Sequence, residues 1–117
     1  MRPDFGLDDE PDEASEMDLL VVLRLSNQTM GTHLERQSIA TFADELEAAV
    51  SEAGVGEYDG DEFGAGECTL FFATHDMDKL LHLLRPMLKR SPLCRGGHLV
   101  RMVADADGNL APRKQQI

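Results

Sequence analysis

The chain has 117 residues, of which 42% are hydrophobic and 5% aromatic, and its net charge at pH 7 is -11. This length suits a single domain with its own core. The negative charge argues against nucleic acids and anionic membrane surfaces as partners, because both attract basic protein surfaces. The sequence has neither a long apolar segment that could span a membrane nor a basic N-terminal region typical of a signal peptide. We therefore expect a cytoplasmic protein that binds neither nucleic acid nor membrane.

The N-terminal segment is expected to be a disordered acidic tail over residues 1–17. Residues 1–18 contain eight acids and a single base, Arg2. Such a segment has too little apolar surface to offset the entropy of ordering it. The sequence therefore predicts a single domain over residues 18–104, followed by a flexible C-terminal tail over residues 105–117.

The first predicted strand runs from Asp18 to Leu25, an apolar run with polar flanks that is typical of a buried central strand. A helix is predicted next, because Thr32 and Glu35 have the spacing of a capping box and Gly54 can end the helix in a left-handed conformation. Its apolar residues recur at helical spacing and form one stripe for the core. They are Ile39, Phe42, Ala43, Leu46, Ala49, Val50 and Ala53.

Two strands joined by a hairpin are predicted after this helix. Residues 57–63 form a weak strand with only two large apolar residues, Tyr58 and Phe63, whereas residues 67–74 form a stronger strand. The glycine-rich connection over residues 64–66 is typical of a short hairpin turn.

The second predicted helix begins after Asp76, a favourable N-cap, and ends before Pro92. The last predicted strand covers residues 98–103. The order strand, helix, strand, strand, helix, strand is typical of an α+β ferredoxin-like βαββαβ sandwich, with both helices on one face of a four-stranded antiparallel sheet. Right-handed crossovers then give the strand order 4-1-3-2, in chain numbering.

One face of such a sheet would carry no helix. Because neighbouring residues of a strand point to opposite faces, either Phe71 or Phe72 must point toward this open face. We treat both as candidates for a dimer face and expect a homodimer.

Two segments resemble a pattern found in a family of small uncharacterised bacterial proteins. The first, residues 53–70, reads AGVGEYDGDEFGAGECTL, and the second, residues 85–93, reads RPMLKRSPL. The family pattern is G-V-G-E-[YF]-D-G-x-E-F-G-x-G-E-C-T-L. The resemblance implies a single small α+β domain and carries over no catalytic residue, since no activity is attached to the family.

Charge is unevenly distributed along the predicted domain. The segment from Glu35 to Glu67 contains ten acids and one base, whereas the segment from Lys79 to Arg101 contains six bases and no acid. A solvated surface with internal ion pairs is the simpler interpretation. The alternative is a self-complementary surface that pairs two copies of the chain.

The most unusual segment is residues 56–67, which contains five carboxylates and four glycines. A tight hairpin, a cation site and a docking surface for a basic partner would each explain it. The carboxylates that would bind such a partner are Glu57, Asp59, Asp61, Glu62 and Glu67. A calcium-binding EF-hand loop is disfavoured, because Phe63 and Leu70 stand where liganding oxygens are needed.

Motifs for catalysis or for cofactor binding do not stand out. The four histidines lack the spacing of a zinc site, and Cys68 and Cys94 form no C-x-x-C pair. Phosphate-binding loops and nucleophile elbows are absent from the sequence. We therefore assign no catalytic residue, no cofactor and no metal ligand, and we favour a non-enzymatic protein without excluding an enzyme.

Three functions fit these observations. The favoured one is a small acidic interaction or regulatory protein, such as an immunity-like protein, that docks a basic partner through the acidic hairpin. The second is a small-molecule sensor whose ligand lies at a dimer interface. The third is a metal-dependent enzyme with Asp59, Asp61, Glu62 and Glu67 as ligands.

Overall fold

The computed structural model describes residues 17–104 and 107–117, so the N-terminal tail expected over residues 1–17 lies outside it except for Met17. The described chain forms five strands, two α-helices and one short 3-10 helix. In chain order these are β1 (Met17–Arg24), α1 (His33–Ala53), β2 (Glu57–Gly64), β3 (Glu67–Thr74), α2 (Met77–Arg90), η2 (Pro92–Cys94), β4 (His98–Ala104) and β5 (Leu110–Gln116).

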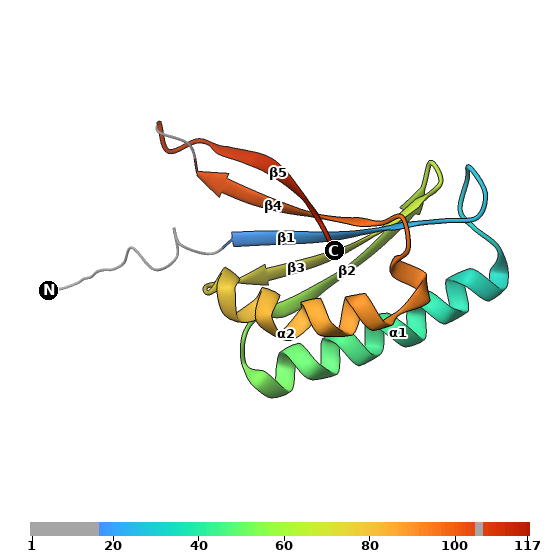
Figure 1. Cartoon of the computed structure of the whole chain (residues 1–117), viewed down its shortest axis with the longest axis horizontal. Coiled ribbons are helices and arrows are strands. Elements are labelled where there is room, and N and C mark those ends of the chain that lie inside the picture. The colour runs from blue at the N-terminus through green and yellow to red at the C-terminus, as the bar shows by residue number, and fades with distance from the viewer. Residues whose placement is uncertain (1–16, 105–106) are drawn as a thin grey trace, which may run out of the picture.

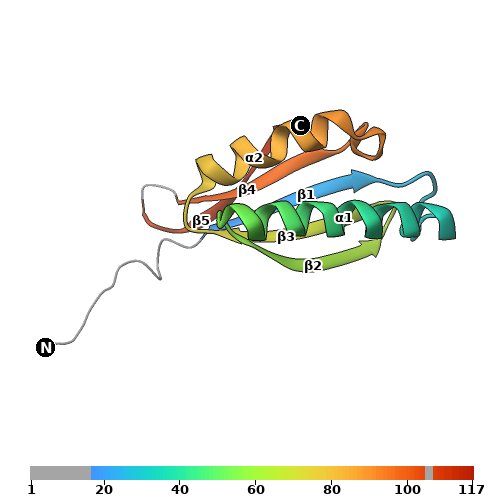
Figure 2. The ribbon, with the colours of Figure 1, turned by 90° about the horizontal axis from the view of Figure 1, so that it is seen from below.

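The strands form one antiparallel sheet in the order β2-β3-β1-β4-β5. Figures 1 and 2 show that both helices cover the same face of this sheet, with α2 near β4 and α1 near β2 and β3. The prediction of an α+β fold with an antiparallel sheet and two helices is confirmed, and the first four strands have the expected order 4-1-3-2. The prediction of four strands is wrong, because β5 extends the sheet beyond β4.

The prediction of a flexible tail over residues 105–117 is also wrong, because residues 110–116 form strand β5. This strand pairs with β4 along its whole length, from His98 opposite Gln116 to Ala104 opposite Leu110. The Arg85 guanidinium of α2 holds its end by donating to the Gln116 carbonyl oxygen at 3.2 Å and to Gln115 Oε1 at 3.3 Å. The sequence gives little sign of this strand, because its residues are mostly exposed and lack an apolar alternation.

The core lies between the helices and the sheet. On the central strands, alternate residues point toward the helices and are fully or almost fully buried: Leu19, Val21, Leu23, Cys68, Leu70 and Phe72. The helices add Ile39, Phe42, Ala43, Leu46 and Val50 from α1, and Met77, Leu80, Leu81, Leu84 and Leu88 from α2. Five of the seven residues predicted for the stripe of α1 are therefore in the core, as their spacing indicated, whereas Ala49 is half-buried and Ala53 is exposed.

The ends of the helices are set by local side chains. Thr32 and Glu35 form the predicted capping box at the start of α1, and Gly54 ends it with a left-handed φ of 68°. The Asp76 side chain accepts from the Lys79 amide at the start of α2. Helix α2 then runs to Arg90 as one α-helix with Pro86 inside it.

Candidate interaction surface

Strand β2 is an outer strand of the sheet, anchored to the core by two aromatic side chains. Tyr58 stands opposite Phe72, and their ring centroids lie 5.3 Å apart, whereas Phe63 stands opposite Cys68. Between these anchors the register shifts at Asp59, where β2 carries one residue more than β3. Such a bulge lets both aromatic residues face the helices although they are an odd number of residues apart.

The bulge also determines where the predicted partner-binding carboxylates lie. Glu57 and Glu62 point to the face of the sheet away from the helices, since they stand opposite Ala73 and Thr69. Asp61 lies on the helix side, where its Oδ2 accepts a hydrogen bond of 3.3 Å from the Tyr58 hydroxyl. Asp59 falls at the bulge itself. All four side chains are exposed.

The fifth candidate, Glu67, lies one strand further in. It begins β3 and stands opposite Gly64 of β2 on one side and Arg24 of β1 on the other. An acid and a base in directly opposite positions attract each other. The structure therefore places four of the five carboxylates on one edge, which we call the acidic edge (Glu57, Asp59, Asp61 and Glu62), and gives Glu67 a basic neighbour.

The described residues contain no group of three or more histidine, cysteine, aspartate or glutamate side chains close enough to hold a metal ion. The acidic edge does not form one because its members are divided between the two faces of β2. The ligand set of the metal-dependent enzyme considered above, which also needed Glu67, is therefore not gathered at one point.

The face of the sheet away from the helices, which we call the open face, has an apolar centre. Phe71 of β3 and Val100 of β4 stand on either side of Leu20 of β1, and all three are partly exposed. Phe72 points the other way and is only 1% exposed in the core. Of the two candidates for a dimer face, Phe71 alone lies on the open face, and the assignment of Phe72 to that face is wrong.

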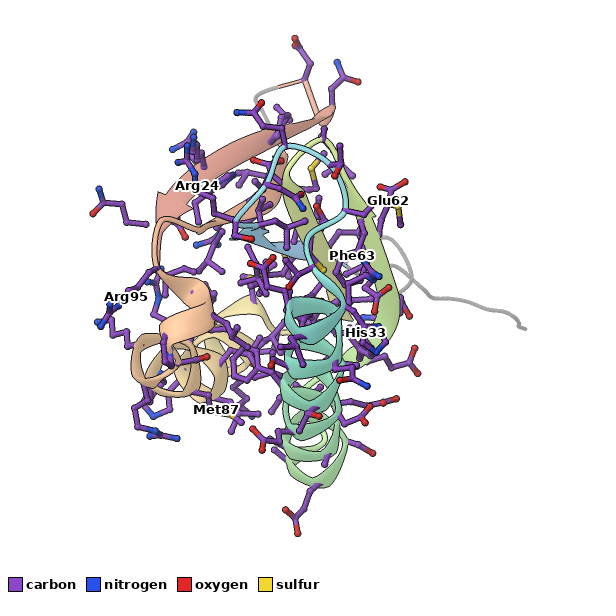
Figure 3. The ribbon with its side chains drawn as sticks, turned by 90° about the vertical axis from the view of Figure 1, so that its right-hand side faces the viewer. Arg24, His33, Glu62, Phe63, Met87 and Arg95 are labelled. Carbon is purple, nitrogen blue, oxygen red and sulfur yellow. The ribbon has the colours of Figure 1, made fainter. Side chains whose placement is uncertain are left out.

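Charge is separated across the sheet as it is along the sequence. The acids of α1 and β2 lie on the β2 side. The bases of the C-terminal part of α2, of the turn after η2, and of β4 and β5 lie on the β5 side, whereas Lys79, in the first turn of α2, lies near the start of β2. Figure 3 shows Glu62 of β2 and Arg95, which follows η2, on opposite sides of the molecule. The bases of that second side are Arg85, Lys89, Arg90, Arg95, Arg101, Arg113 and Lys114.

Both cysteines are buried and reduced. Burial raises the pKa of the Cys68 thiol to about 12, with a further contribution from Asp61, and raises the pKa of the Cys94 thiol to about 11. Because the thiolate is the nucleophile, thiols with such pKa values are inert at neutral pH. Neither cysteine therefore fits a catalytic role.

A hollow of about 330 Å³ lies where the residues before β2 approach the start of α2. Its polar wall includes Thr74, but this hydroxyl already donates to the Val55 carbonyl oxygen at 2.7 Å and accepts from the Asp76 amide at 2.9 Å. These groups serve the fold, since they join the end of α1 to the start of α2. The hollow accordingly gives no specific support to a small-molecule sensor.

Sequence reasoning missed Lys114, the basic residue that β5 places on the open face. It stands opposite Val100 in the register of β4 and β5. Its position could not be inferred while residues 105–117 were expected to be a tail. The neighbouring bases Arg113 and Lys114, in a stretch from 108 to 117 that has no other charged residue, were the only available signal.

Comparisons with protein-family models, with curated proteins and with solved structures found no match to this chain. The resemblance to a family of small bacterial proteins therefore stays a prediction. Within the described residues, no helix combines the length and the hydrophobicity needed to cross a membrane.

Proposed function

We propose that this chain is a non-enzymatic interaction protein that binds a basic protein partner through its acidic edge. The observation that carries the proposal is an outer strand with four exposed carboxylates and no base. A surface of one charge sign accelerates association with a surface of the other sign and suppresses wrong partners. An immunity-like protein that neutralises a basic toxin or enzyme is one form of this function.

The geometry of β2 favours contacts by side chains over the addition of a strand from the partner. The bulge at Asp59 interrupts the hydrogen-bonding pattern of the strand, and charged residues on an outer strand discourage pairing with another strand. A partner that presents lysine or arginine side chains would instead meet carboxylates on both faces of the edge. Such an interaction should weaken as salt is added, because exposed charges are screened.

The test uses charge-neutral variants of the full chain as baits for proteins from the native host. One bait carries Glu57→Gln, Asp59→Asn, Asp61→Asn and Glu62→Gln. The matched control removes the same charge from α1 by Asp44→Asn, Glu45→Gln, Glu47→Gln and Glu52→Gln, all at exposed positions. Circular dichroism melts establish that both variants fold.

We expect a basic partner that the intact chain and the α1 variant retain and that the edge variant loses. Its affinity, measured by surface plasmon resonance, should fall about tenfold or more between 50 and 500 mM salt. A partner that all three baits retain equally would overturn the proposal. Loss of the partner from both variants would also overturn it, since total charge rather than the edge would then decide binding.

A further inference from the structure

We propose that two copies of this chain pair through the open faces of their sheets, so that the acidic edge of each copy lies over β5 of the other. The partner is thus a second copy of the chain, which goes beyond the basic partner proposed above. This pairing uses Glu57 and Glu62 on the open face, so in the dimer the basic partner would meet Asp61 on the helix side and Asp59 at the bulge. The argument rests on three features of the open face, which are its apolar centre, its size and the placement of its charges.

The register across all five strands places one row of side chains at the middle of the open face. From one edge to the other, this row reads Gly60, Phe71, Leu20, Val100 and Lys114. Three partly exposed apolar side chains thus lie side by side, between a glycine at one end and a lysine at the other. Apolar surface of this kind gains free energy when it is removed from water.

The size of the open face suits an interface. Five strands about 4.8 Å apart and up to about 27 Å long give roughly 650 Å² in projection, and side chains increase the accessible area. Stable interfaces bury about 800 Å² per partner. Both helices lie on the other face, and no described segment covers this one (Figures 1 and 2).

The charges select one of the two symmetric ways to stack these faces. A two-fold axis perpendicular to the strands would place β2 over β2, with Glu57 and Glu62 of both copies close together. A two-fold axis parallel to the strands places β2 of each copy over β5 of the other. Lys114 of one copy then lies opposite Gly60 of its partner, between the carboxylates of Glu57 and Glu62.

Gly60 makes room for this contact. Nothing lies within 4 Å of the position where a Cβ would stand on this residue. The lysine can therefore reach over the strand without a clash and approach both carboxylates. Opposite charges would also meet if β2 of one copy lay beside β5 of the next copy in one continuous sheet. That arrangement would not close and would give filaments. It would also leave Phe71 uncovered.

The experiment measures the mass of the full chain by sedimentation equilibrium at several protein concentrations. We expect a dimer that becomes monomeric on Phe71→Lys, while circular dichroism stays unchanged. Lys114→Glu should raise the dissociation constant about tenfold or more. Arg113→Glu is the matched control, because it makes the same change of charge at the neighbouring residue, which points to the helix side.

A mixing experiment tests the direction of the axis. One variant carries Lys114→Glu, and the other carries Glu57→Lys with Glu62→Lys. At a protein concentration between the dissociation constants of the intact chain and of the variants, each variant alone should be mainly monomeric. An equal mixture should form dimers, because the glutamate introduced at position 114 of one variant then faces the lysines introduced at positions 57 and 62 of the other, and Lys114 of the second variant faces Glu57 and Glu62 of the first. An axis perpendicular to the strands would instead leave the Lys114→Glu variant dimeric by itself, which would overturn the proposed arrangement.

Three further outcomes would overturn the proposal. They are a monomeric intact chain at about 100 µM, well above a micromolar dissociation constant, larger species in place of dimers, and dimers that survive Phe71→Lys. A chain that dimerises only after residues 1–16 are deleted would show that this segment, not a second copy, occupies the open face. Failure of the dimer is distinguishable from failure of the proposed function, since partner capture is scored with Phe71→Lys as a separate bait.

Discussion

The two outer strands of the sheet, β2 and β5, differ in both charge and anchoring. β2 is acidic and joins the core through the rings of Tyr58 and Phe63. β5 is basic, has mostly exposed side chains, and is held by Ile117 and by hydrogen bonds from Arg85. The strand with aromatic anchors could be recognised in the sequence, whereas the strand held by its backbone and by a distant arginine could not.

The outer strands β2 and β5 are therefore held in the sheet in two different ways. Side-chain packing fixes the register of β2, because a slip by one residue would expose its aromatic rings. β5 depends instead on its ladder with β4, since only a few of its side chains are buried. Substitutions of core residues should therefore strongly destabilise β2. Substitutions of surface residues should destabilise only β5.

The largest effect is expected from Phe72→Ala, which removes the ring that supports Tyr58. Truncation of a buried phenylalanine leaves a cavity and costs about 3–5 kcal/mol of unfolding free energy. Phe71→Ala is the control at the next residue, where the side chain is partly exposed, and should cost less than half as much in the monomer. Urea unfolding at low protein concentration measures both, and equal losses would contradict the assignment of the two faces.

A smaller effect is expected from Gly97→Ala, which disturbs the entry to β4. A Cβ at this position would clash with the Val22 carbonyl oxygen, so the backbone of β1 or β4 must move. Overpacking of this kind costs about 1–3 kcal/mol. Gly64→Ala, at the end of β2, is the control because nothing lies within 4 Å of its Cβ position. Similar melting temperatures for the two variants would argue against this close approach.

A local effect is expected from Arg85→Met, which removes the two hydrogen bonds that α2 makes with β5. We expect a loss of about 0.5–1.5 kcal/mol in the stability of β5, because hydrogen bonds of this kind contribute that much each and these are partly exposed. Hydrogen exchange should become faster in β5 and stay unchanged in β2. Faster exchange in both strands would mean that the two edges unfold as one unit.

The smallest effect concerns the two thiols, which lie on opposite sides of the charge separation. The pKa of Cys68 is raised to about 12 and that of Cys94 to about 11, so Cys94 should have about ten times more thiolate at pH 8. Alkylation with iodoacetamide, followed by peptide mass spectrometry, should therefore modify Cys94 faster. Equal rates would indicate that both thiols react through unfolding of the whole domain.

These raised pKa values also set the sign of a pH dependence. A thiol that is harder to ionise in the folded state contributes stability below its unfolded pKa, near 9, and this contribution is lost as pH rises toward the folded value. The free energy of unfolding should therefore fall between pH 9 and 11. Cys94→Ala should reduce the slope of that fall, and an unchanged slope would contradict the cause assigned here.

Much of the fold could be predicted because its signals are local. The capping box of Thr32 and Glu35 needs only residues three apart, and Gly54 ends α1 by its own backbone freedom. The apolar stripes of both helices and the buried runs of β1 and β3 were readable for a similar reason, since each repeats at the period of its own element.

The candidate site depended on information that is not local. The bulge at Asp59 decides which carboxylates share a face, and it exists because Tyr58 and Phe63 must both reach the core. The choice between Phe71 and Phe72 follows from the register of β3 against β1 and β2. The position of Lys114 follows from pairing with β4.

The sequence by itself determined the α+β class, the helix ends, the core stripes and the separation of acids from bases along the chain, because propensity, capping and periodicity act between near neighbours. Only the tertiary structure decided that β5 exists, that Phe71 faces outward and that the two charge blocks lie on opposite edges of one sheet. These features depend on pairing between strands that are distant in sequence, and that pairing is selected by the packing of the whole core.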